Sequence, residues 1–295
     1  MPPINFPLFG NSLVMAIVIL IHVFFAFIAV GGILIATASD IIGRITKNPY
    51  YDRIAKGYIL FLSDLMKLGG VLGVLIVILL IGLFPEFSKV LYHIFFWPLL
   101  GEMFFFFLLM ASTICYRHGW EKGNRSPWHL FCGITASCSA VIAAVIINAM
   151  QAFMLSPGNY FQTNNIIDAV FNPTMWASST HLLIPCVMNA AVVAFLFAWY
   201  RTRRATVDNR PYFEWLSHYT GNIAAACMLI QPLSGMLFLL RVRSVHPGVF
   251  TSIIQGPVSP FFWTMATLGI TAFSCAILYN VFGNRARPLI LIGGL

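Results

Sequence analysis

Two histidines lie inside long apolar stretches of this chain, where an imidazole ring needs a partner. His22 lies in LVMAIVILIHVFFAFIAVGGILIA and His181 in MWASSTHLLIPCVMNAAVVAFLFAWY. Each stretch exceeds the roughly 20 apolar residues that cross a bilayer as one helix. Because no water solvates a ring at that depth, such a histidine commonly binds a metal, holds a haem iron or belongs to a proton path. For His181, an ordinary hydrogen bond between helices is the alternative.

A methionine is placed to complete one of these sites. His181 is expected about 10 Å below the outer membrane edge, and Met265, about 9 Å along its own helix, reaches the same level. A histidine and a methionine form the axial ligand pair of some haem sites. Core packing is the alternative for Met265, since the chain has 12 methionines and a thioether fills apolar gaps. Met236 is a weaker candidate for the same role.

Glu102 is the acidic residue best placed for proton chemistry in the apolar interior. It lies in WPLLGEMFFFFLLM, near the middle of a predicted helix. Burial penalises a charged carboxylate, so we expect this side chain to be protonated and neutral. A proton relay beside a cofactor at His22 is the functional interpretation, and a hydrogen-bonded structural acid is the alternative.

Two further groups of polar residues have simpler interpretations. Asp64 and Lys67 are three residues apart on one helical face, which predicts a mutual ion pair, with proton entry from the inner side as the alternative. His118, His129 and His218 fall near inner helix ends. Two of them could in principle hold an inner haem, although interfacial histidines are common in wet loops.

The composition identifies a polytopic membrane protein. Of the 295 residues, 59% are hydrophobic and 9% are charged, and the mean hydropathy is +0.85. Soluble domains carry about 25% charged residues. The net charge of +8 comes from lysines and arginines in short loops, so we expect no nucleic-acid partner. The six cysteines form no CxxC or CxxCH motif, which argues against haem c, an iron–sulfur cluster or a zinc ribbon.

Length and apolarity predict an all-α membrane helix bundle of seven spans, in a single transmembrane domain over residues 1–295. The expected spans are residues 10–38, 57–84, 91–116, 128–155, 174–200, 214–240 and 259–282. The loops expected on one side carry 13 lysines and arginines, and those on the other side carry 3. By the positive-inside rule, the N-terminus is expected outside and the C-terminus inside, which requires an odd number of spans.

The segments that hold these residues resemble the large subunit, subunit I, of cytochrome bd-type quinol oxidases. LIHVFFAFIAVGGILIA is similar to the family's first helix, and GGVLGV followed by GLFPEF is similar to its Gly-rich second helix. PLLGEMFFFFLLMAS resembles the third helix, FNPTMWASSTHLLIPCVMNAAV the fifth, and FFWTMATLGITAF the helix after the quinol loop. The order of these segments, over most of the chain, carries the resemblance.

The resemblance implies haem ligands at specific positions. His22 matches the ligand of the family's active-site haem, and Glu102 matches its first buried glutamate. His181 matches the ligand of the quinol-side haem b, and Met265 matches the second ligand of that haem. The implied cofactors are one or two haem b groups, with haem d as an alternative.

The chain also departs from the family's pattern. The second buried glutamate falls at about Met110, and the arginine before the methionine ligand is Trp263. The connection from Arg241 to Val258 is shorter than the family's quinol loop. The family's further helices, which carry the glutamate ligand of a third haem, have no counterpart before Leu295, so we expect no complete three-haem site.

These observations favour a haem b-containing oxidoreductase subunit that transfers electrons between a membrane quinone or quinol and partner redox subunits of a respiratory complex. A compact bd-type quinol:oxygen oxidoreductase is the first alternative. A haem-free proton-coupled transporter using Asp64, Lys67 and Glu102 is the second, and an anchor for a soluble dehydrogenase is the third. We expect a multi-pass protein of a bacterial or archaeal cytoplasmic (inner) membrane.

Overall fold

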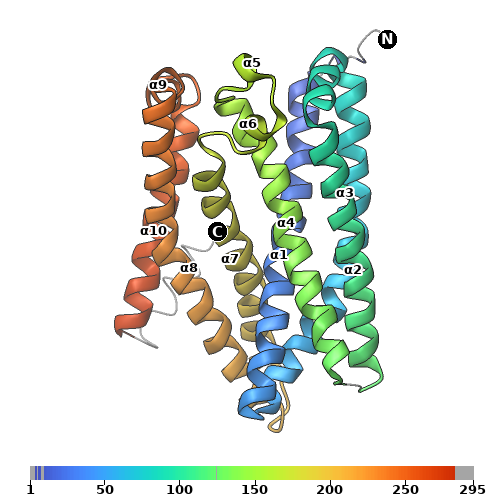
Figure 1. The fold of residues 1–295 in the computed structure, drawn as a ribbon. Coiled ribbons are helices and arrows are strands. Elements are labelled where there is room, and N and C mark those ends of the chain that lie inside the picture. Colours follow the sequence, from blue (N-terminus) through green and yellow to red (C-terminus); the bar gives the residue numbers. More distant parts are fainter. Residues whose placement is uncertain (1–3, 5, 8–9, 124, 283–295) are drawn as a thin grey trace. The chain divides into compact units, whose positions relative to one another are not determined.

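The computed structural model describes residues 4, 6–7, 10–123 and 125–282, and every regular element in this part of the chain is a helix (Figure 1). Six helices are long and apolar enough to cross a membrane, and a seventh span results if one bent pair of helices counts as a single span. The prediction of an all-helical polytopic membrane protein is confirmed. The chain divides into two compact units, Met1–Ile147 and Asn148–Leu295.

The first unit consists of long helices joined by very short turns. They are α1 (Asn11–Thr46), α2 (Pro49–Leu83), α3 (Pro85–Glu121) and most of α4 (Pro127–Leu155). The turn after α1 is closed by Lys47, which adopts the left-handed conformation and donates its N–H to the Gly43 carbonyl. Asn48 then caps α2 by accepting from the Tyr50 N–H. Sharp caps of this kind make α1 and α2 neighbours along their length.

Small residues let α1 and α2 approach closely, as is common between membrane helices. A Cβ built on Gly32 would lie 2.9 Å from a Leu62 methyl carbon, so no larger residue fits there without a shift. Ile33 and Ile59 are fully buried. Farther along the chain, α3 bends at Phe95, where φ is −102° and ψ is 19°. Pro98 causes this bend, because a proline in a helix clashes with the preceding turn.

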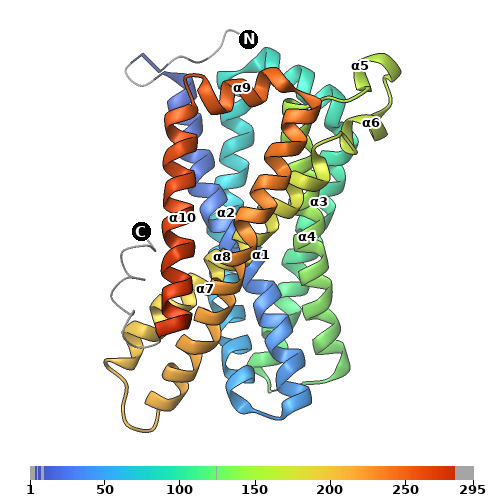
Figure 2. The same ribbon diagram turned by 90° about the vertical axis from the view of Figure 1, so that its left-hand side faces the viewer.

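The second unit contains two long packed helices and a bent third one. After the end of α4 come α5 (Tyr160–Thr163), α6 (Ile166–Val170), α7 (Met175–Thr202), α8 (Arg210–Val245), α9 (Pro247–Gln255) and α10 (Ser259–Phe282). Helix α7 packs against α8, and α10 packs against α8 and α9. Figure 2 shows α9 crossing from the end of α8 to the start of α10, and the two helices α9 and α10 meet at 76°.

Several predicted boundaries are wrong, because polar residues continue helices beyond the apolar windows. Helix α1 runs to Thr46 instead of residue 38, and α2 starts at Pro49 instead of residue 57. The expected connection over 241–258 contains the end of α8 and the whole of α9, and the expected connection over 156–173 contains α5 and α6. Apolarity marks the part of a helix that lies in lipid, whereas caps decide where the helix ends.

Candidate functional site

The His22 ring is held by α2 and keeps one nitrogen open. Its Nδ1 lies 3.1 Å from the Gly69 carbonyl oxygen. Because a carbonyl only accepts, Nδ1 carries the proton and Nε2 keeps its lone pair. Histidines that bind a metal are commonly fixed in this way through the other ring nitrogen. The side chain of His22 is half-buried.

A glycine on α2 leaves space for this ring. A Cβ built on Gly73 would lie 3.2 Å from His22 Cε1, so a side chain at this position would displace the imidazole. Gly69 and Gly73 are four residues apart and therefore lie on one face of α2. One turn of this helix thus both anchors the His22 ring and makes room for it.

Glu102 lies on α3, one turn beyond the proline that bends this helix. Its side chain is half-buried, and no hydrogen bond or ion pair joins its carboxyl group to any other described residue. One turn farther on, Phe106 faces α2, where a Cβ on Gly70 would meet its ring at 3.5 Å. A carboxyl group without a partner in an apolar setting remains free to take up or release a proton.

The start of α7 is fixed by buried side-chain amides, which set the position of the histidine on this helix. Asn172 is 2% exposed and donates to the carbonyls of Ala149 and Ala169, at 3.0 Å each. Asn148 donates to the hydroxyls of Ser178 at 2.7 Å and Ser179 at 2.9 Å. These bonds tie the first turns of α7 to the end of α4 within the second unit.

A proline makes the backbone at His181 dependent on α8. Pro185 lies four residues after His181 and has no N–H, so the His181 carbonyl lacks its usual helical donor. The side-chain nitrogen of Gln231, on α8, donates to this carbonyl at 3.3 Å. The amide therefore satisfies an acceptor that the proline leaves open.

The His181 ring contacts side chains of α8 through the same ring nitrogen, Nδ1, that His22 uses on α2. Its Nδ1 lies 3.1 Å from Ser234 Oγ and 3.1 Å from the Gln231 side-chain nitrogen. Nε2 is 3.5 Å from that nitrogen, which is too long for a strong hydrogen bond. A Cβ on Gly235 would lie 3.0 Å from His181 Cε1. Gly69 and Gly73 are four residues apart on α2, and Gln231 and Gly235 are four residues apart on α8, where Ser234 directly precedes the glycine.

Met265 lies on α10, and its side chain is 63% exposed in the structure. Helix α10 packs against α8 and α9, whereas the side chains that hold His181 come from α8. The role of Met265 as a second haem ligand therefore remains a prediction from the family resemblance. Met236, the weaker candidate on α8, is 57% exposed.

The donor set suits a haem better than a bare metal ion. Among the described residues, no three His, Cys, Asp or Glu side chains come together. A haem iron needs one or two protein ligands, because the macrocycle supplies the other four. An anchored histidine with an open nitrogen and a glycine beside its ring fits that requirement, and both His22 and His181 provide it.

The structure also contains a buried ionic network that the sequence did not reveal. Asp40 is 0% exposed and accepts from Arg44 Nε at 2.9 Å, Arg125 Nη2 at 2.8 Å and the Tyr116 hydroxyl at 3.2 Å. Arg125 also pairs with Asp52. The network joins α1, α2 and α3 to the residues before α4. The four-residue spacing of Asp40 and Arg44 was the available signal, but it fell beyond the predicted first span.

The three inner histidines do not share one role. His129 is 3% exposed, and its ring lies 4.6 Å from that of Tyr116 and 5.0 Å from that of Trp120. Neither of its nitrogens has a hydrogen-bond partner among the described residues. His118 is exposed on α3 and His218 is exposed on α8.

The predicted ion pair between Asp64 and Lys67 is confirmed, at 2.7 Å.

Comparisons with known proteins identify a family and a shared fold. The family described as Cytochrome bd terminal oxidase subunit I matches residues 12–253. A protein of Bacillus subtilis (strain 168) is named "Putative cytochrome bd menaquinol oxidase subunit I" and is 23% identical over an alignment of 303 residues. The alignment covers 92% of this chain and 68% of the relative. The structure of bd oxidase from Geobacillus thermodenitrificans matches with a TM-score of 0.81 and 18% identity, over 96% of this chain and 82% of that chain. The structural match shows a shared fold.

Proposed function

This chain belongs to the cytochrome bd terminal oxidase subunit I family, and we propose that it is a haem b-bearing subunit that transfers electrons between a membrane quinone or quinol and partner redox subunits. The observation that carries the proposal is the matched anchoring of His22 and His181. Each ring contacts the following helix through Nδ1 and has a glycine of that helix beside its Cε1. The Gly69 carbonyl leaves Nε2 of His22 its lone pair for an iron, and Nε2 of His181 would have a lone pair for an iron when Nδ1 donates to Ser234 Oγ.

The proposed roles of the residues follow from these contacts. His22 and His181 would each hold one haem b, and a bound haem supplies reversible one-electron chemistry. The Gly69 carbonyl would keep the His22 ring protonated on Nδ1, while α8 would orient the His181 ring. Met265 is the proposed second ligand beside His181. Glu102 would hold or release a proton next to the His22 site.

A second candidate function is complete quinol:oxygen oxidoreduction, with oxygen reduced at the His22 site. The family description as a terminal oxidase and the menaquinol oxidase name of the Bacillus relative support this candidate. The same family membership favours both redox functions over the haem-free transporter. We propose a bacterial cytoplasmic membrane as the location, since the named relatives are bacterial.

A reduced-minus-oxidised optical spectrum of the purified full-length protein tests the proposal, with pyridine haemochrome quantification. We expect one or two haem b groups per chain. His181→Ala should remove one low-spin haem b and leave the His22 site loaded, because the two rings depend on different helices. His93→Ala is the matched control, since His93 is exposed on α3 and should keep the full haem content. A colourless protein from haem-replete cells would refute both redox functions, and quinol-dependent oxygen uptake would favour the second candidate.

A further inference from the structure

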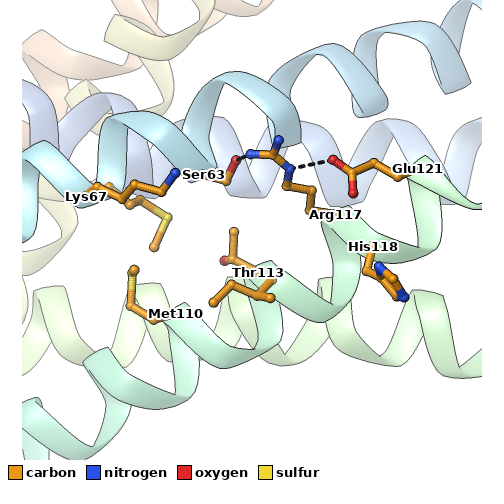
Figure 3. Close-up of a pocket in the computed structure, with 9 residues that line it drawn as sticks. Ser63, Lys67, Met110, Thr113, Arg117, His118 and Glu121 are labelled. Atoms are coloured by element: carbon orange, nitrogen blue, oxygen red, sulfur yellow. Dashed lines mark hydrogen bonds and ion pairs between the residues drawn. The ribbon is translucent and has the colours of Figure 1, made fainter.

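A cavity of about 270 Å³ lies between α2 and α3 in the first unit, close to the end of α3 (Figure 3). Residues of α2 form one wall and residues of α3 form the other. The lining residues are Ser63, Met66, Lys67, Met110, Thr113, Ile114, Arg117, His118 and Glu121. None of the three predicted haem ligands, His22, His181 and Met265, lines the cavity, so it is separate from the proposed redox sites.

Charged groups of both signs surround this cavity. Arg117 donates to Ser63 Oγ across the gap and to Glu121 at 2.8 Å, as Figure 3 shows. Lys67 pairs with Asp64 at 2.7 Å, and Arg117 lies 3.6 Å from the same carboxylate. The two cations and two carboxylates cancel, so the wall is polar and strongly dipolar without a net charge.

Thr113 supplies a buried hydroxyl that has no partner. The residue is 2% exposed, and no hydrogen bond satisfies its Oγ1 among the described residues. Thr180 and Thr220 instead donate to the carbonyl four residues back in their helices. Thr113 faces the space between α2 and α3, opposite Ser63 and Lys67 (Figure 3). A buried hydroxyl normally finds a partner, so this one points to a bound polar group.

The other lining residues include apolar side chains, and one of them is exposed on the surface of the helices. Met66 and Met110 lie beside the polar groups, and Ile114 is 60% exposed on the outside of α3. Such a cavity has a polar end at the end of a membrane helix and an apolar side along it. Amphipathic molecules with the same two parts are membrane lipids.

We propose that this cavity binds the headgroup of a zwitterionic phospholipid with a primary ammonium, of the phosphatidylethanolamine type. The phosphate would accept from Lys67, Arg117 and the Thr113 hydroxyl, and the ammonium would donate to Glu121 and Asp64. An acidic headgroup would bring a phosphate but no ammonium to donate to Glu121 and Asp64. A trimethylated headgroup could not donate hydrogen bonds to them, because its nitrogen carries no hydrogen.

Native mass spectrometry of the delipidated full-length protein tests this proposal with phosphatidylethanolamine, phosphatidylcholine and phosphatidylglycerol of identical acyl chains. We expect one phosphatidylethanolamine to bind about tenfold more tightly than the other two lipids, the effect of one charge-assisted hydrogen bond. Thr113→Val should reduce this binding about tenfold, whereas Thr113→Ser should retain it. Glu121→Gln should remove the preference over phosphatidylcholine.

Two control variants separate the site from general effects on the protein. Thr220→Val removes a buried threonine hydroxyl outside the cavity, and Lys56→Met removes an exposed charge elsewhere on α2. Neither should change the lipid preference. Equal binding of all three lipids would overturn the proposal, as would unchanged binding by a folded Thr113→Val variant. Displacement of the lipid by inorganic phosphate alone would also overturn it, because the cavity would then be a simple anion site.

Discussion

The orientation of each proposed haem-ligand histidine depends on a residue that lacks a Cβ or an N–H. Gly73 and Gly235 lack a Cβ, and a Cβ at either position would approach the nearby ring Cε1 to 3.2 Å or 3.0 Å. Pro185 lacks an N–H, so the carbonyl of His181 accepts from Gln231 instead. The missing Cβ atoms and the missing N–H therefore influence the orientation of each imidazole. A metal ligand requires such an ordered orientation.

Replacing Glu102 tests whether a proton moves through this residue. Glu102→Gln should leave the haem content near normal, because an amide has nearly the shape of a protonated carboxyl group. It should lower any proton-coupled turnover by about 100-fold, since the amide cannot release a proton. Pyridine haemochrome quantification measures the haem content, and stopped-flow reoxidation with a pH indicator measures the proton-coupled turnover. Glu86→Gln, an exposed glutamate at the start of the same helix, is the control and should behave as wild type. Loss of all haem in Glu102→Gln would show a structural role instead.

Replacing Met265 tests the second ligand of the proposed His181 haem. Met265→Leu keeps volume and apolarity, so the stability should change by less than about 1.5 kcal/mol. The thioether raises the reduction potential of a haem that it ligates, so the variant should be high-spin or of lower potential at that haem alone. Redox titration followed by optical spectra measures this change. Met236→Leu on α8 is the matched control, and a shift in that variant with none in Met265→Leu would transfer the role to Met236.

At the scale of elements, the first unit is held at one end by charge as well as by apolar packing. Asp40 of α1 receives hydrogen bonds from Arg44, Arg125 and Tyr116, and Arg125 continues to Asp52 of α2. A buried carboxylate with three donors has its lone pairs satisfied, which is the condition under which a buried ion pair persists. The same contacts connect the end of α1, the start of α2 and the last turns of α3.

Removing the charge of Asp40 should therefore destabilise this end of the first unit. Asp40→Asn leaves two half-buried arginines without the buried carboxylate that they share, and the free energy of unfolding should fall by about 3 kcal/mol. Equilibrium unfolding in mixed detergent micelles, followed by circular dichroism, measures the change. Asp64→Asn is the matched control, because the Asp64–Lys67 pair is exposed and should contribute little. Equal stability of the wild type and Asp40→Asn would show that the network is not needed for folding.

Sequence patterns predicted the helices and singled out the candidate ligands, but they did not predict the contacts that surround those ligands. Helices were visible because membrane spans must be long and apolar, and His22 and His181 stood out because imidazoles are rare at that depth. The roles of Gly73 and Gln231 depend on which turn of α2 or α8 faces a ring, which no local pattern encodes. Asp40 was missed because the predicted span stopped at residue 38, where the apolar residues give way to polar ones.

At the scale of the whole molecule, the distribution of charge bears on the number of spans. The helices α9 and α10 meet at 76°, so they form either one bent span or a re-entrant pair. Seven spans would place the two ends of the sequence on opposite sides of the membrane, and six would place them on the same side. No lysine or arginine precedes Arg44, whereas Arg285 and Arg287, outside the described residues, follow the last helix. The positive-inside rule therefore favours seven spans.

Labelling of introduced cysteines with a membrane-impermeant maleimide decides between these topologies. With native thiols blocked or replaced, Lys47→Cys, Arg203→Cys and Arg285→Cys should react only after the membrane is opened. Asn164→Cys, in the connection between α5 and α6, should react in intact cells. The expectation rests on 13 lysines and arginines in the loops of one side against 3 in those of the other. Labelling of position 285 from outside, with position 47 still protected, would establish six spans and make α9–α10 a re-entrant pair. Labelling of position 47 from outside would show that the whole chain has the opposite orientation.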